Sequence, residues 1–508
     1  MNTYSTMNLS VKGQITGWTL QISLLFFSNS NFGQSGENLF NDQFIHEIRI
    51  EGIDTISFFQ YASKGVYVMC DVDIDGQTID SIGCTTKGNI SWSHPQNKKP
   101  LKFKLNEFVN GRKYDGIREF YLHNSYEDPS LMREKLTYDI CKAAGLHALR
   151  TAFCKLFING NYWGLYTLVE AKDELYKRGF ENKNAGVFET LDFGSPCFYS
   201  QDPMYWEVEN GNPSVNWPRL EKLTSILANT PDNQYLDTIP KYFNMDDFLT
   251  YQAINVYLLN FDSFLGYNGN QLYLFDSAIE NRFQVIPWDF NASFGLWNTE
   301  NYNPNTLDAI PSVFNGKCPV NRMTTLTELK MTYLNSLCLL NNVICDSASL
   351  NAKITSLIEM LQPAIYSDNR KMPTNHEFDV AVGYGNLTFG SSMNNVPGLR
   401  SFVANRWVKI KNDLSDLGFQ CTNNLLDNEE ESSLVVYPNP AKTSIFLNFK
   451  GEKAFTYRIF NTNGQCVSEG ELKVGQNETS ISHLQDGVYL IEFWDTSTRI
   501  DVQRFVKM

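Results

Sequence analysis

The chain has 508 residues, of which 42% are hydrophobic and 14% aromatic, so it can bury more apolar surface than one domain of ordinary size. Its formal net charge of −14 argues against a nucleic-acid-binding surface, because phosphate backbones are bound by clustered lysines and arginines. The ten cysteines include no C-x-x-C pair, which argues against a structural zinc site and leaves disulfides possible. We therefore expect a globular protein of more than one domain that binds no nucleic acid, although a local basic pocket could still hold a nucleotide.

The first 33 residues have the pattern of a secretory signal peptide. Lys12 precedes an apolar run from Trp18 to Phe27, and small polar residues follow up to Gly33. This run is too short to span a bilayer, and no later segment approaches the roughly 20 apolar residues that a transmembrane helix needs. We therefore expect a signal peptide over residues 1–33, cleaved near Gly33, and no transmembrane anchor. The alternative is a terminal segment with an incidental apolar patch.

Short runs that alternate between apolar and polar residues predict β-strands in the first third of the chain. These runs cover residues 44–50, 66–74 and 101–105. Two further runs, 151–158 and 162–169, flank Asn159-Gly160, which is typical of a tight hairpin turn. The N-terminal part is therefore expected to be rich in antiparallel strands.

Capping residues predict two helices. Asp128 is the expected N-cap of the first, with Pro129 at its first position and Gly145 after its end. The second starts at Asn244, and its apolar residues recur every three or four positions. These residues are Phe248, Tyr251, Ile254, Leu258 and Phe261. The second helix would deliver Asp262 to the end of its last turn.

Two aspartates, Asp262 and Asp289, bracket a predicted hairpin whose first strand begins at Asn270. Phosphoryl transfer needs a carboxylate that accepts the proton of the attacking hydroxyl, and carboxylate or amide oxygens that hold magnesium against the phosphates. Asp262 fits the first role, and Asn270 and Asp289 fit the second. A single Asp after a helix is more often a turn or cap residue, so the hypothesis depends on the whole arrangement.

The C-terminal part differs from the rest of the chain in composition and residue pattern. Residues 421–433 are polar and acidic, as in a linker, and residues 434–508 contain short alternating runs that predict a small β-sandwich. This tail resembles the C-terminal sorting domain of the type IX secretion system in four motifs. They are Tyr437-Pro-Asn-Pro440, Asn463-Gly464, Gly487-Val-Tyr489 and Arg504-Phe-Val-Lys507. The resemblance implies handling by the type IX secretion machinery and a secreted or outer-surface location; the alternative is a carbohydrate-binding or adhesive β-module.

Residues 38–420 resemble the CotH-type secreted kinases, a family named for a spore coat protein. The motifs that carry the resemblance are Gly83-x-x-x-Lys87-Gly-Asn89, Asp128-Pro-Ser-Leu-Met-Arg133, Ile158-Asn-Gly-Asn-Tyr-Trp-Gly-Leu-Tyr166, Asn260-Phe-Asp262 and Ile286-Pro-Trp-Asp289. The resemblance implies an α+β domain with an atypical protein-kinase-like fold that uses ATP and Mg²⁺. It also implies that Asp262 is the catalytic aspartate and Asp289 the metal ligand.

Lys99 and Lys102 are the candidates for contacts to the nucleotide phosphates, since they precede or lie on a predicted strand. Lys104 shares a face with Lys102 by the two-residue period of a strand. Glu134 or Glu170 could pair with such a lysine, and Glu170 has the better match to the family. The same lysines also fit a solvated edge strand that resists aggregation.

Two functions remain open. The first is a secreted or cell-surface kinase that transfers phosphate from ATP to a hydroxyl of a protein substrate, which Asp262, Asn270 and Asp289 favour. The second is a catalytically idle kinase-fold protein for surface binding or adhesion. Thr85 and Thr190 favour the second, because the family usually has a cation near each of these positions.

Overall fold

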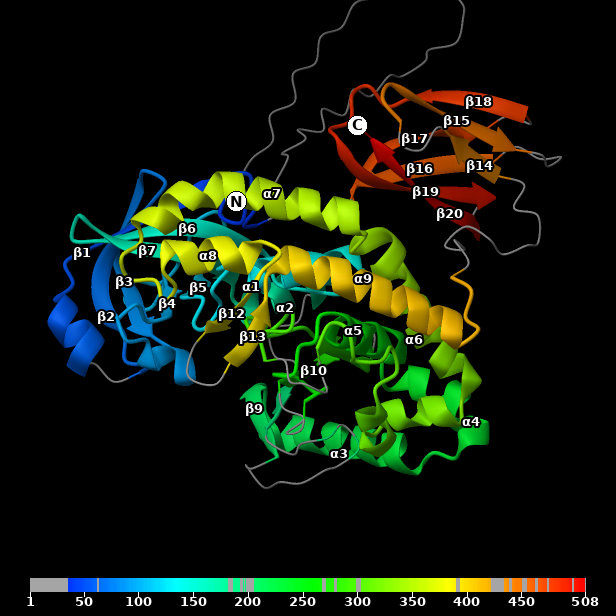
Figure 1. The fold of residues 1–508 in the computed structure, drawn as a ribbon, viewed down its shortest axis with the longest axis horizontal. Helices are drawn as coiled ribbons and strands as arrows, with labels where there is room; N and C mark the ends of the chain where they lie inside the picture. The colour runs from blue at the N-terminus through cyan, green and yellow to red at the C-terminus, as the bar shows by residue number, and fades with distance from the viewer. Residues whose placement is uncertain are drawn as a thin grey trace, which may run out of the picture.

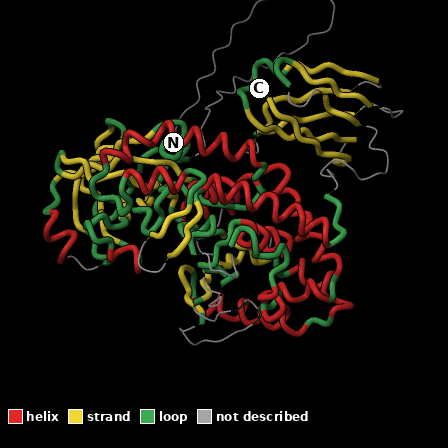
Figure 2. The backbone as a smooth tube through the Cα atoms, in the orientation of Figure 1, coloured by secondary structure: helices red, strands yellow, loops and turns green. Residues whose placement is uncertain are grey.

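The computed structural model describes residues 35–507 apart from several short segments (Figure 1). The segments left out are 62–63, 181–185, 192–194, 196, 198–204, 267–270, 278–280, 298–302, 390–392, 422–433, 438–440, 450–454, 462–464, 473–474 and 496–497. The predicted signal peptide, most of the predicted linker and Asn463-Gly464 lie outside the described residues. The described chain is a mixed α and β structure (Figure 2).

Seven strands close into a barrel in the order β1-β2-β3-β4-β5-β7-β6. They are β1 (Ile45–Glu51), β2 (Val68–Ile74), β3 (Gln77–Thr86), β4 (Leu101–Lys104), β5 (Glu119–His123), β6 (Thr151–Ile158) and β7 (Asn161–Glu170). Only β1 and β6 pair in parallel within this barrel. Alternate apolar side chains, among them Val72, Phe103 and Leu156, fill one buried core.

The strands predicted from alternation are confirmed as β1, β2 and β4. The predicted hairpin is confirmed as β6 and β7. Its turn residues Asn159 and Gly160 have φ values of 48° and 76°, which is the left-handed geometry that a two-residue hairpin turn demands.

The first predicted helix begins later than expected. It is α1 (Arg133–Ala143), whereas the sequence predicted a start just after Asp128. The Asp128 carboxylate instead accepts hydrogen bonds from the backbone N–H groups of Ser130 and Arg133, and Leu131 has a φ of 55°. A left-handed residue interrupts a right-handed helix, so residues 128–132 form a turn that leads into α1. The predicted end is confirmed, because Gly145 has a φ of 86° just after the helix.

The second half of the domain combines a four-stranded sheet with most of the helices (Figures 1 and 2). The sheet order is β11-β10-β8-β9, with β8 (Val187–Thr190), β9 (Trp206–Asn210), β10 (Leu272–Ser277) and β11 (Arg282–Ile286). The helices are α2 (Lys172–Phe180), α3 (Pro213–Asn229), α4 (Asp232–Thr238), α5 (Met245–Tyr257), α6 (Thr327–Leu339), α7 (Ser347–Ser367), α8 (Asn375–Val382) and α9 (Leu399–Asp416). A two-stranded sheet, β12 (Asn386–Phe389) and β13 (Met393–Pro397), lies between α8 and α9 in the chain. Single-turn helices are η1 (Ser57–Tyr61), η2 (Ile90–Ser93), η3 (Ile239–Lys241), η4 (Ser312–Gly316), η5 (Val320–Thr324) and η6 (Leu340–Ile344).

The helix and hairpin that carry the predicted aspartates are present. The Asn244 side chain accepts a hydrogen bond from the backbone N–H of Asp247, as an N-cap does, and opens α5. The helix ends at Tyr257, earlier than the apolar period predicted, because Leu259 has a φ of 49°. Strands β10 and β11 pair as the predicted antiparallel hairpin.

Disulfides join distant segments within the domain. They are Cys197–Cys318 and Cys338–Cys421. The second ties α6 to the segment after α9, just before the tail. The remaining six cysteines are free: Cys70, Cys84, Cys141, Cys154, Cys345 and Cys466. Disulfides of this kind suit a protein that leaves the cytosol.

The tail forms two antiparallel sheets of the orders β14-β15-β18 and β17-β16-β19-β20. Their strands are β14 (Leu434–Tyr437), β15 (Ser444–Phe449), β16 (Phe455–Asn461), β17 (Cys466–Leu472), β18 (Gly475–Ser480), β19 (Gly487–Asp495) and β20 (Thr498–Lys507). Apolar side chains of both sheets, including Leu447, Ile459 and Phe493, share one buried cluster. The tail therefore has its own hydrophobic core, separate from those of the preceding domain.

Helix α7 packs against the barrel strand β7 (Figure 1). Asp368, just after this helix, accepts hydrogen bonds from the Lys98 ammonium at 2.7 Å and from the backbone N–H of Leu165 at 3.0 Å. The side chains of Lys98 and Asp368 are 0% and 1% exposed. A buried ammonium that loses its carboxylate has no water to replace it, so this ion pair locks α7 to the barrel.

The Asp368→Asn variant is expected to lose about 3–5 kcal/mol of unfolding free energy, because it leaves the Lys98 charge buried without a counter-charge. The matched control is Asp308→Asn, since Asp308 is 73% exposed and pairs with Lys409 at the surface. The control should lose less than about 1 kcal/mol. Urea titration of the purified protein measures both, and equal losses would contradict the assignment.

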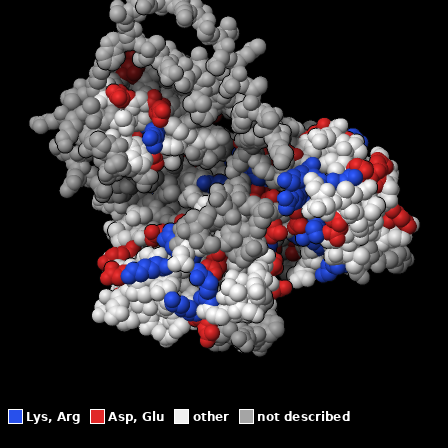
Figure 3. All heavy atoms as spheres, turned by 180° about the vertical axis from the view of Figure 1, so that it is seen from behind, with Lys and Arg blue, Asp and Glu red and all other residues white. Residues whose placement is uncertain are grey.

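Basic and acidic side chains are interspersed over the described part of the face shown in Figure 3. Ion pairs among the described residues include Arg112 with Asp80 and Lys104 with Glu107. The excess of acidic residues is therefore compatible with cations held in specific places.

Candidate functional site

Lys87 is the first residue after strand β3, at the end of the barrel. Its ammonium lies 2.9 Å from Nε2 of His123, the last residue of β5. It also lies 4.3 Å from the ring centroid of Tyr121 and 5.1 Å from that of Trp288. Burial lowers the pKa of Lys87 to about 8. A nearby anionic ligand would stabilise the charged form of a lysine whose pKa is lowered in this way.

Glu134 completes a chain of three side chains. It is the second residue of α1, and its Oε1 lies 2.7 Å from Nδ1 of His123. With a charged lysine and an ionised glutamate, Nδ1–H of the imidazole donates to Glu134 and Nε2 accepts from Lys87. The three residues therefore form one continuous hydrogen-bonded row, Lys87–His123–Glu134.

Asp289 follows β11 and has a φ of 54°, which is uncommon for a residue other than glycine. Its pKa is raised, chiefly by burial and then by the Glu134 carboxylate, while His123, Lys87 and Lys172 oppose the rise. All four of these groups therefore lie within electrostatic reach of one carboxyl. Strained backbone and a perturbed carboxyl at the same residue are typical of a functional site.

Lys172 brings a second ammonium to the same place. It is the first residue of α2, and its Nζ lies 3.0 Å from Oε2 of Glu209 on β9. The ammonium is 4.0 Å from the ring centroid of Tyr273 and 4.5 Å from that of Trp288. The Trp288 ring thus contacts the ammonium groups of both Lys87 and Lys172, which fixes two cations beside Asp289.

Asp262 lies in the turn after α5. This turn is anchored by Asn260, whose backbone N–H donates to the Asn255 carbonyl at 2.9 Å and whose amide donates to the Asn255 side chain at 3.1 Å. Burial raises the pKa of the Tyr251 phenol, and the charges of Asp262 and Asp289 raise it further. Both aspartates therefore lie within electrostatic range of one buried phenol.

Other residues named from the sequence have different positions. Asn270 lies outside the described residues. Lys102 pairs with Glu119 at 2.9 Å, and its charge still acts on Lys87. The ammonium of Lys99 packs on the Trp92 ring, 3.0 Å from its centroid.

Glu170, the preferred partner for a lysine in the sequence analysis, is fully buried and binds Arg150. Its carboxylate accepts from the Arg150 backbone N–H at 3.0 Å and from Nε at 3.1 Å. Of the two glutamates that the sequence left open, Glu134 is the one in the row with Lys87. Glu170 instead fixes the start of the β6–β7 hairpin.

Sequence reasoning missed Lys87, His123 and Lys172 as site residues. Lys87 stands in the first glycine motif, one position after a strand, and that was the signal available for it. His123 and Lys172 had no comparable motif, because their roles depend on how β5 and α2 meet Asp289. Spatial contacts of this kind have no fixed spacing in the sequence.

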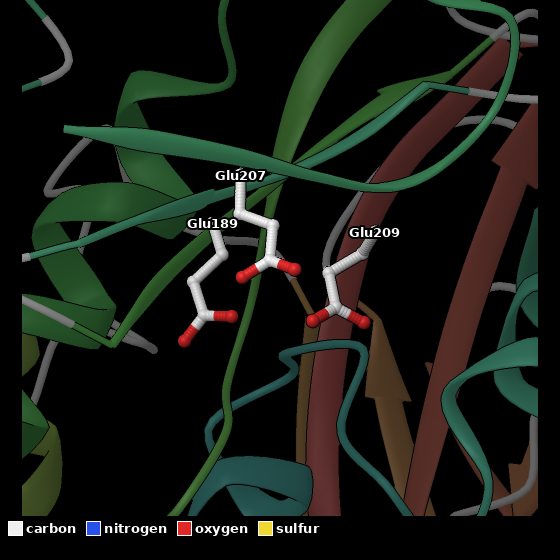
Figure 4. A group of neighbouring side chains, drawn as sticks. All are labelled: Glu189, Glu207 and Glu209. Atoms are coloured by element: carbon white, nitrogen blue, oxygen red, sulfur yellow. The ribbon is translucent and has the colours of Figure 1, made fainter. Parts of the chain in front are cut away.

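A group of three glutamates borders the site (Figure 4). Glu189 on β8 and Glu207 and Glu209 on β9 each offer a carboxylate oxygen, and these oxygens lie within 4.8 Å of one another. Burial raises the pKa of Glu189 to about 7, while Lys172 lowers it. The Lys172–Glu209 ion pair joins this group to the ring of Trp288, so the negative charge helps to place Lys172.

The sequence profile described as CotH kinase protein matches residues 85–408. The chain belongs to this family. The resemblance seen in the motifs is thereby confirmed. A second profile, described as secretion system C-terminal sorting domain, matches residues 435–508, which confirms the interpretation of the tail.

Curated CotH relatives come from a bacterium and a fungus. Inner spore coat protein H of Bacillus subtilis (strain 168) is 26% identical over 212 residues, covering 40% of this chain and 57% of that protein. Invasin CotH3 of Rhizopus delemar is 23% identical over 359 residues, covering 66% and 59% respectively. Spore coat protein homolog 1 of the same fungus is 22% identical over 260 residues, covering 49% and 42%. The chain thus spans between 42% and 59% of the length of these three relatives.

A similar solved chain comes from the HipA, HipB and operator DNA complex of Shewanella oneidensis MR-1. It aligns over 63% of this chain and 64% of its own length, with 12% identity and a TM-score of 0.27. At this score the similarity supports no argument about fold or function.

The sorting domain marks this CotH-family protein for secretion and attachment at the cell surface. Among the described residues, none of the helices is both long and apolar enough to cross a bilayer. The expected location outside the cell is therefore confirmed by the tail.

The Asp289→Asn variant is expected to unfold at a higher temperature than the parent at pH 8 in the absence of magnesium. The folded-state pKa of Asp289 lies above its ordinary value, so ionising this carboxyl destabilises the folded protein. The parent therefore loses stability as the pH rises and the carboxyl ionises. The gain should shrink toward pH 5, where more of the parent carboxyl is protonated. Thermal unfolding at both pH values measures it, and a variant less stable than the parent at pH 8 would show that the nearby cations outweigh burial.

Proposed function

We propose that this CotH-family protein is a kinase that transfers the γ-phosphoryl group of ATP to a hydroxyl of a protein outside the cell. The observation that carries the proposal is the row Lys87–His123–Glu134 beside Asp289, with Asp262 on the preceding turn. Its chain order is that of a protein kinase: a lysine by the third strand, a glutamate on the next helix, then a catalytic and a metal-binding aspartate. This order supports a kinase-like fold for the domain, and the shared core of the tail sheets supports a β-sandwich.

The residues present fit a magnesium site. Asp289 is a half-buried carboxyl with a raised pKa, and a divalent cation beside it would stabilise its ionised form. Asp289 and, by position, Asn270 would hold Mg²⁺. The metal, when bound, would neutralise charge on the β- and γ-phosphates.

The proposed chemistry then uses this chain's own side chains. Lys87 and Lys172 hold the phosphate oxygens through charge-assisted hydrogen bonds. The oxygen of the substrate hydroxyl bonds to the γ-phosphorus while Asp262 accepts the proton of that hydroxyl. The bond between the γ-phosphorus and the β,γ-bridging oxygen breaks, and ADP leaves. The products are a phosphorylated protein and ADP.

This assignment revises the nucleotide contacts expected from the sequence. Lys102 stays in the proposed site, since its charge acts on Lys87. The proposal assigns no nucleotide contact to Lys99 or Glu170, because they contact Trp92 and Arg150 instead.

A second candidate, a catalytically idle surface-binding or adhesion protein, is favoured by Thr85 and Thr190. Thr85 is buried on β3, and the Thr190 hydroxyl accepts a hydrogen bond from the Leu272 backbone at 3.1 Å. Neither provides the cation that the family usually has there. In the first proposal Lys87 and Lys172 take over that charge. Relatives that carry the name invasin belong to the same family and suit the second.

Calorimetry of ATP in magnesium is expected to show saturable binding by the parent and none by Asp289→Ala. Lys87→Met should weaken binding about 10- to 100-fold, because it removes one charge-assisted hydrogen bond to phosphate. Lys411→Met is the matched control, since Lys411 is an exposed lysine that packs on Trp407 far along the chain. Absence of binding by a folded parent would contradict the kinase proposal and favour the idle protein.

The affinity for Mg-ATP is expected to fall about tenfold between pH 7 and pH 9. Lys87 has a pKa of about 8 in the free protein, so roughly nine molecules in ten have lost that charge at pH 9. Titrations at several pH values measure the fall, and Lys87→Met should remove it. An unchanged slope in that variant would assign the dependence to another group.

A further inference from the structure

We propose that His123 is a positioning residue that sets the location of the Lys87 ammonium and holds the Glu134 carboxylate one ring away from it. The inference deepens the proposed function and rests on it. In the kinase pattern the lysine and the glutamate form a direct ion pair. Here an imidazole stands between them.

Both ring nitrogens of His123 have hydrogen-bond partners, so the imidazole bridges Lys87 and Glu134. Nδ1 of His123 lies 2.7 Å from Glu134, and Nε2 lies 2.9 Å from the Lys87 ammonium. The side chains of His123 and Glu134 are 15% and 6% exposed, so water competes little for these contacts. The imidazole therefore determines where the tip of a flexible lysine side chain lies.

The ring itself is held by aromatic neighbours. It is stacked with Tyr121 at 9° and 6.1 Å between centroids, and it stands edge-on to Trp288 at 90° and 6.0 Å. Trp288 is the residue before Asp289, so the ring is fixed against the same segment that carries the proposed metal ligand. A shift of His123 would move Lys87 relative to Asp289.

The glutamate end of the row is also fixed. Arg133, which precedes Glu134, is fully buried and donates to the Asp128 carboxylate at 2.6 Å and to the Pro397 carbonyl at 3.0 Å. These contacts tie the first turn of α1 to β13. Glu134 is thus a rigid acceptor that orients the imidazole.

The bridge has an electrostatic consequence. A carboxylate in direct contact would offset much of the ammonium charge, and that attraction weakens as the separation grows. With an imidazole between them, Lys87 keeps a hydrogen-bond acceptor but more of its positive charge is available to a phosphate. The imidazole therefore fixes the position of the half-buried Lys87 ammonium without neutralising its charge.

Two substitutions of similar polarity separate the two halves of the bridge. In His123→Gln the side-chain amide reaches the position of Nε2 and can still accept from Lys87. In His123→Asn the amide reaches only the position of Nδ1, so it can donate to Glu134 but not contact Lys87. A residue that merely fills space would tolerate or reject both alike.

Mg-ATP titration calorimetry of the full chain tests the proposal. His123→Gln should bind within about threefold of the parent, and His123→Asn should bind about tenfold more weakly, the cost of one misplaced charged contact. In a Lys87→Met background the Asn substitution should have no further effect, since it acts through Lys87. An Asn variant equal to the parent, or additive with Lys87→Met, would overturn the inference.

Parent protein that fails to bind Mg-ATP would overturn the proposed function and this inference with it, whereas a binding parent with an unaffected Asn variant overturns the inference alone. Nitrogen-15 NMR of the parent gives a second test that needs no variant. The bridge requires a neutral His123 that carries its proton on Nδ1. A proton on Nε2 instead would contradict it.

Discussion

The candidate site depends on one electrostatic balance, that of the half-buried Asp289 carboxyl among charged groups of both signs. Burial and Glu134 raise its pKa, and Lys87, Lys172 and His123 oppose them. None of these charges is close to Asp289 in the sequence, so the barrel, α1 and α2 must all be in place before the balance exists. A bound cation would offset the negative charges and a bound polyanion the positive ones, which is why we propose magnesium and a nucleotide as the ligands of this site.

Much of the fold could be predicted from local patterns. The Asn159-Gly160 hairpin, the Asn244 cap and the strands before Asp289 are all present, because each depends on neighbouring residues alone. The predicted start of α1 was wrong. The Asp128 carboxylate accepts a hydrogen bond from the Arg133 backbone N–H and so stabilises a turn before the helix, which begins only at Arg133. A short polar side chain can serve either purpose, and only the following backbone decides between them.

Only part of the candidate site could be predicted from the sequence, for a physical reason. Asp262 and Asp289 were named as candidates because they flank secondary structure with a distinct pattern. Lys87, His123 and Lys172 could not, since contacts across strands and helices leave no periodic signal in the sequence. Glu170 was preferred to Glu134 on family resemblance, yet its buried partner is Arg150. The predicted ligand Asn270 lies outside the described residues, so its role stays a prediction.

The most direct test is a crystal structure of the protein with Mg²⁺ and a non-hydrolysable ATP analogue. The account predicts one metal on the Asp289 carboxylate, a phosphate oxygen within hydrogen-bond distance of Lys87, and the γ-phosphate facing Asp262. A nucleotide bound elsewhere, or one bound here with no phosphate oxygen near Lys87 and no metal at Asp289, would contradict it.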